Sequence, residues 1–137
     1  MQRELWGPSL WSTIHYIALA YPAYPSAQDR AYYKNFYTAL ANVIPCQKCS
    51  YNYKRHLQEL PLDEHLQSTD QLFEWTVKLH NIVNRENNKR TWTTQQAREF
   101  YLHLVKPNTG FDYNMLYVVG IIILIFVCLY MSKRKLT

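Results

Sequence analysis

The sequence lacks the features of several common protein classes. It has only three glycines and contains neither Asn-Gly nor Asp-Gly, the dipeptides that favour tight β-hairpin turns. Charged residues make up only 18% of the chain and hydrophobic residues 48%, a balance that excludes a disordered tail or a low-complexity linker. No internal repeat is visible. With 137 residues, the chain has room for one compact domain with its own core.

Basic runs are also missing from most of the chain. The formal net charge is +5, yet the lysines and arginines before the C-terminus are scattered. A nucleic-acid-binding domain usually concentrates such residues on one face or in one run. We therefore expect no nucleic-acid partner, and a phosphate-bearing cofactor accounts for the excess of basic residues.

The C-terminal part differs in composition from the rest. No charged residue occurs from Tyr113 through Ser132, and Lys133, Arg134 and Lys135 follow. As a helix rising about 1.5 Å per residue, the segment 115–131 would extend roughly 25 Å, close to a bilayer hydrocarbon core of about 30 Å. We expect a domain over 1–106, a linker over 107–114, a single C-terminal transmembrane helix over 115–131 and a basic tail over 132–137.

The N-terminus shows no secretory signal peptide, because Arg3 and Glu4 precede Pro8 with no apolar segment between them. A domain followed by one C-terminal anchor is typical of tail-anchored proteins. We therefore expect a single-pass membrane protein whose domain is cytosolic. The basic tail alone would favour the opposite orientation, so the direction of threading stays open.

Residues 1–106 should be all-α. Strict alternation of apolar and polar residues is rare there, whereas apolar residues recur at spacings of three and four. Proline and capping residues then set the limits of each helix. The expected helices run from Pro8 to about residue 20, from 29 to 43, from Cys46 to about 60, from Ser68 or Thr69 to about 87, and from Thr93 or Thr94 to about 105.

The sequence CQKC contains Cys46 and Cys49, and three uses of this pair are conceivable. A structural zinc site would need two more ligands, and none of the histidines at positions 15, 56, 65, 80 and 103 has the usual finger spacing. A structural disulfide would close so short a loop that it constrains the unfolded chain very little. The third use is redox chemistry.

The surroundings of Cys46 favour the redox use. Because Pro45 ends the preceding helix, Cys46 lies at or near a helix N-terminus, where free backbone N–H groups stabilise a thiolate. Lys48 and Lys54 add positive charge nearby. Such a thiolate can exchange with a disulfide, and Cys49 can resolve the mixed disulfide.

Three segments of the sequence together resemble a known family. They are WGPSLWSTIHYIALAYP (Trp6–Pro22), CQKC (Cys46–Cys49) and FEWTVKLHNIVNRENNKRTW (Phe73–Trp92). In this order and spacing they resemble the Erv/ALR family of FAD-dependent sulfhydryl oxidases. The resemblance implies a four-helix bundle with a short fifth helix, and FAD bound at its mouth beside the Cys-x-x-Cys pair.

The resemblance also implies site residues. Cys46 and Cys49 would be catalytic, with Cys49 next to the flavin and Cys46 exchanging with the substrate. His80 and Asn84, four apart, share one helix face, and Lys89 could neutralise the pyrophosphate. Taken singly, the aromatic residues would be interpreted as core packing. The residues expected to bind the cofactor are Gly7, Trp11, His15, Cys49, His80, Asn81, Asn84, Lys89 and Trp92.

The implied cycle begins when a substrate dithiol reduces the Cys46–Cys49 disulfide, and two electrons then pass through FAD to O2, giving hydrogen peroxide. Two departures from the family are visible: Pro8 replaces the arginine that commonly follows the glycine, and the only other cysteine, Cys128, lies in the apolar segment. Without a distal cysteine pair, a separate thiol protein, such as a thioredoxin-like relay, would bring the electrons.

Stripped-down members of this kind are typical of large DNA viruses, so we expect a viral protein of a virion or host intracellular membrane, and a homodimer. Two alternatives remain open: a zinc-stapled helical adaptor, and a tail-anchored helical scaffold without enzymatic activity.

Overall fold

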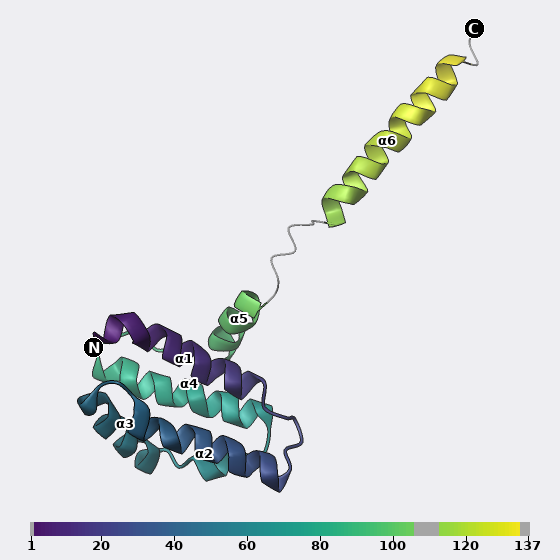
Figure 1. The fold of residues 1–137 in the computed structure, drawn as a ribbon. Coiled ribbons are helices and arrows are strands. Elements are labelled where there is room, and N and C mark those ends of the chain that lie inside the picture. The colour runs from purple at the N-terminus through teal and green to yellow at the C-terminus, as the bar shows by residue number, and fades with distance from the viewer. Residues whose placement is uncertain (1, 106–112, 135–137) are drawn as a thin grey trace. The chain divides into compact units, whose positions relative to one another are not determined.

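The computed structural model describes residues 2–105 and 113–134, and all of their regular secondary structure is helical (Figure 1). It comprises two units, residues 1–103 and 104–137, which are described separately. The helices are α1 (Arg3–Leu19), α2 (Ala27–Val43), α3 (Gln47–Glu59), the short 3₁₀ helix η1 (Leu62–His65), α4 (Thr69–Glu86), α5 (Thr94–Val105) and α6 (Tyr113–Arg134). The expected all-α class is confirmed.

Local capping explains where two of these helices begin. Ser26 caps α2 in a reciprocal capping box with Asp29: the Asp29 N–H donates to Ser26 Oγ at 3.1 Å, and the Ser26 N–H donates to Asp29 Oδ2 at 2.8 Å. Helix α2 therefore begins before the expected residue 29. Ser68 caps α4, as expected, by accepting from the Gln71 N–H at 3.3 Å.

The expected start of the first helix was wrong. Helix α1 begins at Arg3, and Pro8 lies inside it instead of opening it. Proline removes one backbone donor and crowds the carbonyl of the preceding turn. Pro8 is still close to the N-terminus, where few helical hydrogen bonds precede it, so the helix continues through it.

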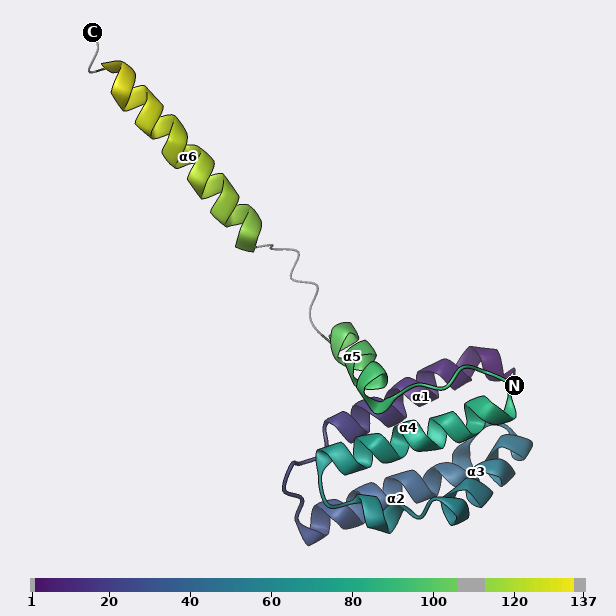
Figure 2. The same cartoon turned by 180° about the vertical axis from the view of Figure 1, so that it is seen from behind.

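In the first unit, α1 packs against α4, α2 packs against α3, and η1 covers part of α4. Figures 1 and 2 show α1 running alongside α4 in both views, with α2 and α3 forming the other side of the bundle. The loop after α3 thus returns the chain to α4, and this brings Cys46 and Cys49 into the same bundle as the HNIVN segment of α4.

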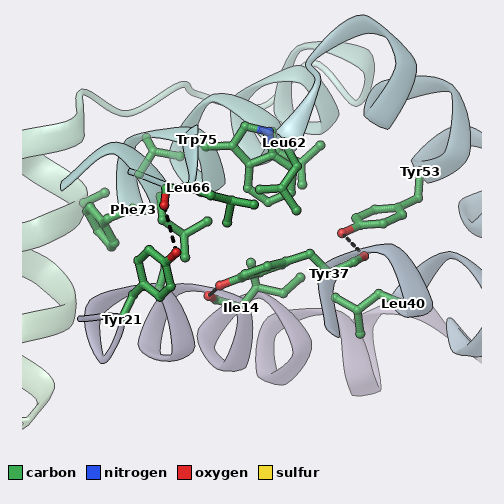
Figure 3. Packing of buried hydrophobic residues seen from close by; sticks show 14 of the residues in the cluster. Ile14, Tyr21, Tyr37, Leu40, Tyr53, Leu62, Leu66, Phe73 and Trp75 are labelled. Carbon is green, nitrogen blue, oxygen red and sulfur yellow. Dashed lines mark hydrogen bonds between the residues drawn. The ribbon is translucent and has the colours of Figure 1, made fainter. Parts of the chain in front are cut away.

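The core contains several aromatic side chains whose polar ends donate to backbone carbonyls, packed among aliphatic residues (Figure 3). Tyr37 OH donates to the Ile14 carbonyl at 3.0 Å, and Tyr53 OH donates to the Tyr37 carbonyl at 2.9 Å. Trp75 Nε1 donates to the Leu60 carbonyl at 3.0 Å. Each bond satisfies a buried hydroxyl or indole and fixes the distance between two elements.

The second unit contains α6. Among the residues that the structure describes, we find no helix with both the length and the apolarity needed to cross a membrane. The transmembrane helix expected over 115–131 is therefore not confirmed. Most of the expected linker and tail, residues 107–112 and 135–137, lies outside the described residues.

Candidate active site

Cys46 and Cys49 form a disulfide at the start of α3. Cys46 is the N-cap of this helix, and its Sγ accepts from the Cys49 N–H at 3.2 Å. Ser50 donates its hydroxyl to the Ala41 carbonyl, which ties the first turn of α3 to the last turn of α2. The expected place of Cys46 at a helix N-terminus is confirmed, and a thiolate released there would be stabilised by a backbone N–H and by the helix dipole.

A second cluster lies between α1 and α4. The rings of Trp11 and His80 are stacked, with centroids 4.0 Å apart and planes 3° from parallel. His15 Nε2 and His80 Nδ1 are 3.1 Å apart, and His15 Nδ1 is 2.9 Å from Thr76 Oγ1. Three of the expected cofactor residues, Trp11, His15 and His80, are thus in contact with one another.

The hydrogen bond of Thr76 determines the proton positions in this cluster. Because its hydroxyl donates to the Phe73 carbonyl at 2.7 Å, Thr76 Oγ1 must accept from His15 Nδ1–H. Neutral His15 then accepts at Nε2, and His80 donates to it from Nδ1. One directed chain of hydrogen bonds therefore runs from His80 through His15 and Thr76 to the backbone of α4.

Electrostatics keep both imidazoles neutral. Burial, followed by the neighbouring His80, lowers the pKa of His15 to about 3. Burial, followed by the positive charge of Lys89, lowers the pKa of His80 to about 4. The pair therefore stays uncharged near neutral pH and can accept or donate hydrogen bonds without adding charge to the site.

The turn after α4 holds Lys89 near this cluster. The carbonyl of Asn84 accepts from the Lys89 N–H at 2.8 Å and from the Asn87 N–H at 3.1 Å. Asn88 has a φ of 53°, in the left-handed region that asparagine tolerates better than most residues. The chain thus reverses within a few residues, with Asn84 buried at its base.

Asn81 is engaged with the backbone of Trp92. Its Nδ2 donates to the Trp92 carbonyl at 2.7 Å, and its Oδ1 accepts from the Trp92 N–H at 2.9 Å. The Trp92 ring is 40% exposed and meets Phe100 edge to face, with centroids 5.4 Å apart. In this arrangement the amide of Asn81 positions Trp92.

The pairing of α1 with α4 shows where Gly7 lies. Arg3 donates to Asn87 Oδ1 at 3.4 Å at one level, and Trp11 stacks on His80 at another. These two contacts show that α1 and α4 are antiparallel. Gly7 is midway between Arg3 and Trp11 along α1, and Asn84 is about midway between His80 and Asn87 along α4. A Cβ atom at Gly7 would meet no neighbouring atom within 4 Å. The space beside α1 at Gly7 is therefore not filled by other described residues.

Trp6, next to Gly7, has an unsatisfied donor. Its Nε1 is buried and has no hydrogen-bond partner among the described residues. A buried donor without a partner costs free energy, so a bound molecule with an acceptor oxygen would be favoured there. Room at Gly7, the Trp6 donor, the positive Lys89 and the stacked rings fit a nucleotide cofactor such as FAD.

Sequence reasoning missed two residues of this site. Trp6 begins the first segment of the family resemblance, but nothing in that pattern indicates that its indole N–H is buried without a partner among the described residues. Tyr101 of α5 is buried and its ring lies 4.6 Å from that of His15, centroid to centroid. Only the apolar periodicity of its helix could have indicated that Tyr101 faces the bundle.

The structure does not support the zinc-stapled alternative in the part of the chain that it describes. Among the residues that the structure describes, no group of three or more His, Cys, Asp or Glu side chains could hold a metal ion. The two cysteines are joined to each other.

Comparison with known proteins decides the family, because the model of the Erv1/Alr family matches residues 8–102. The chain belongs to this family. It is 36% identical over 119 residues to a probable FAD-linked sulfhydryl oxidase of Acanthamoeba polyphaga mimivirus, covering 86% of this chain and 83% of the relative. It is 34% identical over 86 residues to a putative FAD-linked sulfhydryl oxidase of Invertebrate iridescent virus 3, covering 63% of this chain and 58% of the relative.

The fold agrees with this assignment. The crystal structure of the yeast Erv1 core superposes with a TM-score of 0.67 at 25% identity, covering 79% of this chain and 86% of that one. The expected resemblance to the family and to its viral members is therefore confirmed. The matched part of the chain spans 58% of the length of the iridescent-virus relative.

Proposed function

We propose that this chain is an FAD-linked sulfhydryl oxidase that forms disulfide bonds in partner thiols. The observation that carries the proposal is the Cys46–Cys49 disulfide at the N-terminus of α3, in a chain of the Erv1/Alr family. The two viral relatives are named a probable and a putative FAD-linked sulfhydryl oxidase, which supports the same cofactor here. Neither the zinc-stapled adaptor nor the non-enzymatic scaffold accounts for these features together.

The residues that would hold FAD lie on α1, α4 and the turn that follows α4. Trp11, His15 and His80 offer stacked rings, Lys89 offers positive charge for the pyrophosphate, and Trp6 offers a donor. When bound, FAD supplies a two-electron acceptor that reoxidises the cysteine pair and passes the electrons to O2 as hydrogen peroxide.

The chain's own chemistry is thiol–disulfide exchange. A substrate thiolate attacks Sγ of Cys46, and the Cys46–Cys49 bond breaks with its electron pair on Cys49. The second substrate thiolate then attacks the substrate sulfur of the mixed disulfide and releases Cys46 as a thiolate. The Cys49 N–H, 3.2 Å from the Cys46 sulfur in the disulfide, is placed to stabilise that thiolate. The substrate leaves as a disulfide, and Cys46 and Cys49 are both left reduced.

The electron donor in this proposal is a separate thiol protein, for example a thioredoxin-like relay. Within these 137 residues the only cysteine besides the redox pair is Cys128, in the apolar C-terminal segment. A homodimer belongs to the same proposal, and light scattering of the purified protein would test it.

Membrane attachment is also proposed, from the sequence alone. Residues 113–132 are uncharged, and a basic tail follows. Alkaline carbonate extraction of expressing cells should leave the full chain in the membrane pellet and release a chain truncated after residue 106. Full release of the intact chain would contradict the anchor.

The central test of the proposed function is a visible absorption spectrum of the purified full chain, before and after adding dithiothreitol without oxygen. Flavin absorption that bleaches with the thiol and recovers in air, with hydrogen peroxide formed, is the expected result. In the Cys49→Ser variant, FAD should stay bound but no longer bleach. A correctly folded chain that cannot take up FAD would overturn the proposal.

A further inference from the structure

Two exposed apolar residues lie close to the redox cysteines in the sequence, one before Cys46 and one after Cys49. Val43, the last residue of α2, is 69% exposed, and Tyr51, in the first turns of α3, is 71% exposed. The hydrogen bond from Ser50 to the Ala41 carbonyl joins these two helix ends. Single exposed apolar residues are common on protein surfaces, but these two precede and follow the redox pair by only three and two residues.

Positive charge predominates from the start of α3 to beyond its middle. From residue 44 to residue 58 the sequence contains Lys48, Lys54 and Arg55 and no aspartate or glutamate. Lys48 and Lys54 are exposed, and neither is in an ion pair with a described residue. Arg55, the residue after Lys54, is by contrast paired with Glu59 at 2.7 Å and also with Glu86. The N-terminal dipole of α3 adds to the positive potential at the disulfide.

This inference rests on the proposed function, in which a separate thiol protein reacts with the Cys46–Cys49 disulfide directly. The one other cysteine of the 137 residues is Cys128, in the apolar segment. We propose that Val43, Lys48, Tyr51 and Lys54 form a docking surface for a protein dithiol whose cysteines are flanked by acidic and apolar residues. The charge complementarity points to an acidic partner, and the exposed Tyr51 and Val43 offer apolar contact beside the reacting sulfur.

Attraction between this surface and an acidic segment acts mainly on the rate of encounter. Electrostatic steering typically raises association rates by about 10-fold to 1,000-fold and weakens steeply as salt is added. The docking surface therefore predicts a preference between protein dithiols that small neutral dithiols do not experience. It also predicts that this preference disappears at high ionic strength.

The test compares three substrates of the FAD-loaded full chain in low salt. These are dithiothreitol and two synthetic peptides with the same Cys-x-x-Cys core, one flanked by aspartate and leucine and the other by lysine and leucine. The measured quantity is kcat/KM for oxygen consumption with each peptide, divided by that for dithiothreitol. We expect the acidic peptide to exceed the basic one at least 10-fold, and the ratio to approach one in about 0.5 M salt.

Variants of the docking surface test whether these residues cause the preference for the acidic peptide. The double variant Lys48→Gln/Lys54→Gln should reduce the ratio of acidic to basic peptide at least threefold, and Tyr51→Ser should lower kcat/KM for both peptides relative to dithiothreitol. The control is Lys34→Gln, which removes one positive charge from α2, where Lys34 pairs with Asp63 at 2.7 Å; it should leave the ratio unchanged.

Two failures can be told apart. If dithiothreitol is oxidised but the two peptides react equally, or the control lowers the ratio as much as the double variant, the docking surface is overturned and the oxidase stands. If FAD-loaded protein oxidises no dithiol at all, the proposed function is overturned, and the docking surface with it.

Discussion

His56 Nε2, on α3, donates a hydrogen bond to Oε1 of Glu86 at 2.9 Å. Glu86 is the last residue of α4. The His56 side chain is fully buried, whereas that of Glu86 is about one-third exposed. The hydrogen bond from His56, followed by that from Arg55, lowers the pKa of Glu86 below its usual value. The bond joins the helix that carries the redox cysteines to the turn that positions Lys89.

Removing the carboxylate should therefore weaken both the fold and the cofactor site. In Glu86→Ala, the buried His56 N–H loses its acceptor, which should lower the free energy of unfolding by about 1–3 kcal/mol. FAD affinity should fall as well, because Asn87, Asn88 and Lys89 follow directly. Urea unfolding and FAD titration of the apoprotein measure the two effects.

Glu59→Ala is the matched control for that change. Glu59 also accepts from Arg55, at 2.7 Å, but both side chains of this pair are more than 40% exposed. Exposed pairs within one helix contribute only about 0.3–0.5 kcal/mol. Equal losses in the two variants would contradict a special role of the His56–Glu86 bond.

The buried histidine pair predicts acid sensitivity. His15 has a pKa of about 3 in the folded protein, against about 6.5 in an unfolded chain, so the unfolded state binds more protons between these values. The stabilisation is complete above about pH 6.5 and is lost as pH falls toward 3. For His15 alone the loss from about pH 8 to about pH 5 should be about 2 kcal/mol.

Urea unfolding followed by circular dichroism across this pH range measures the loss. The variant His15→Asn has no titrating group at this position and should show a flatter dependence, although its stability at neutral pH will be lower. An unchanged slope in the variant would show that other groups cause the acid sensitivity.

The indole N–H of Trp6, which has no partner among the described residues, leads to separate predictions for stability and for FAD affinity. In Trp6→Phe, the free protein loses no hydrogen bond, because Nε1 has no partner among the described residues, so its stability should change little beyond lost packing. If Nε1 donates to FAD, the dissociation constant should rise about threefold to tenfold, the value of one ordinary hydrogen bond. Fluorescence titration of apoprotein with FAD separates the two; unchanged affinity would remove Trp6 from the site.

Much of the site could be predicted from the sequence because its signals are local. Pro45 and the following spacing place Cys46 at a helix N-terminus, and the four-residue spacing of His80 and Asn84 places them on one face of a helix. Such signals need only the neighbouring residues of one element.

The remaining features depend on how helices register against each other, which local patterns do not encode. His56 and Glu86 are 30 residues apart, and their contact follows from the packing of α3 near the end of α4. The open position beside Gly7 and the orphan donor of Trp6 likewise appear only once α1 is aligned with α4. The start of α1 differs from the prediction for another reason: proline is typical of a first helical turn, yet a helix can also continue through proline near its N-terminus, as α1 does at Pro8.

The amide of Asn81 predicts an ordered loss of cofactor affinity. Its two hydrogen bonds, at 2.7 and 2.9 Å, fix the backbone of Trp92 against α4. Asn81→Asp can still accept from the Trp92 N–H but cannot donate to its carbonyl, whereas Asn81→Ala can do neither. If Trp92 contacts FAD, the dissociation constant should rise in the order wild type, Asp, Ala, with about a tenfold increase for Ala.

The control for Asn81 is Asn35→Ala, an exposed amide on α2 away from these residues, which should leave FAD affinity unchanged. Trp92→Phe distinguishes the two roles of the segment, because it keeps both backbone bonds to Asn81 and changes only the ring. A drop in affinity for Trp92→Phe similar to that for Asn81→Ala means that Asn81 acts through the Trp92 ring. If Asn81→Ala weakens binding and Trp92→Phe does not, the amide instead holds the whole segment from Lys89 to Trp92 in place.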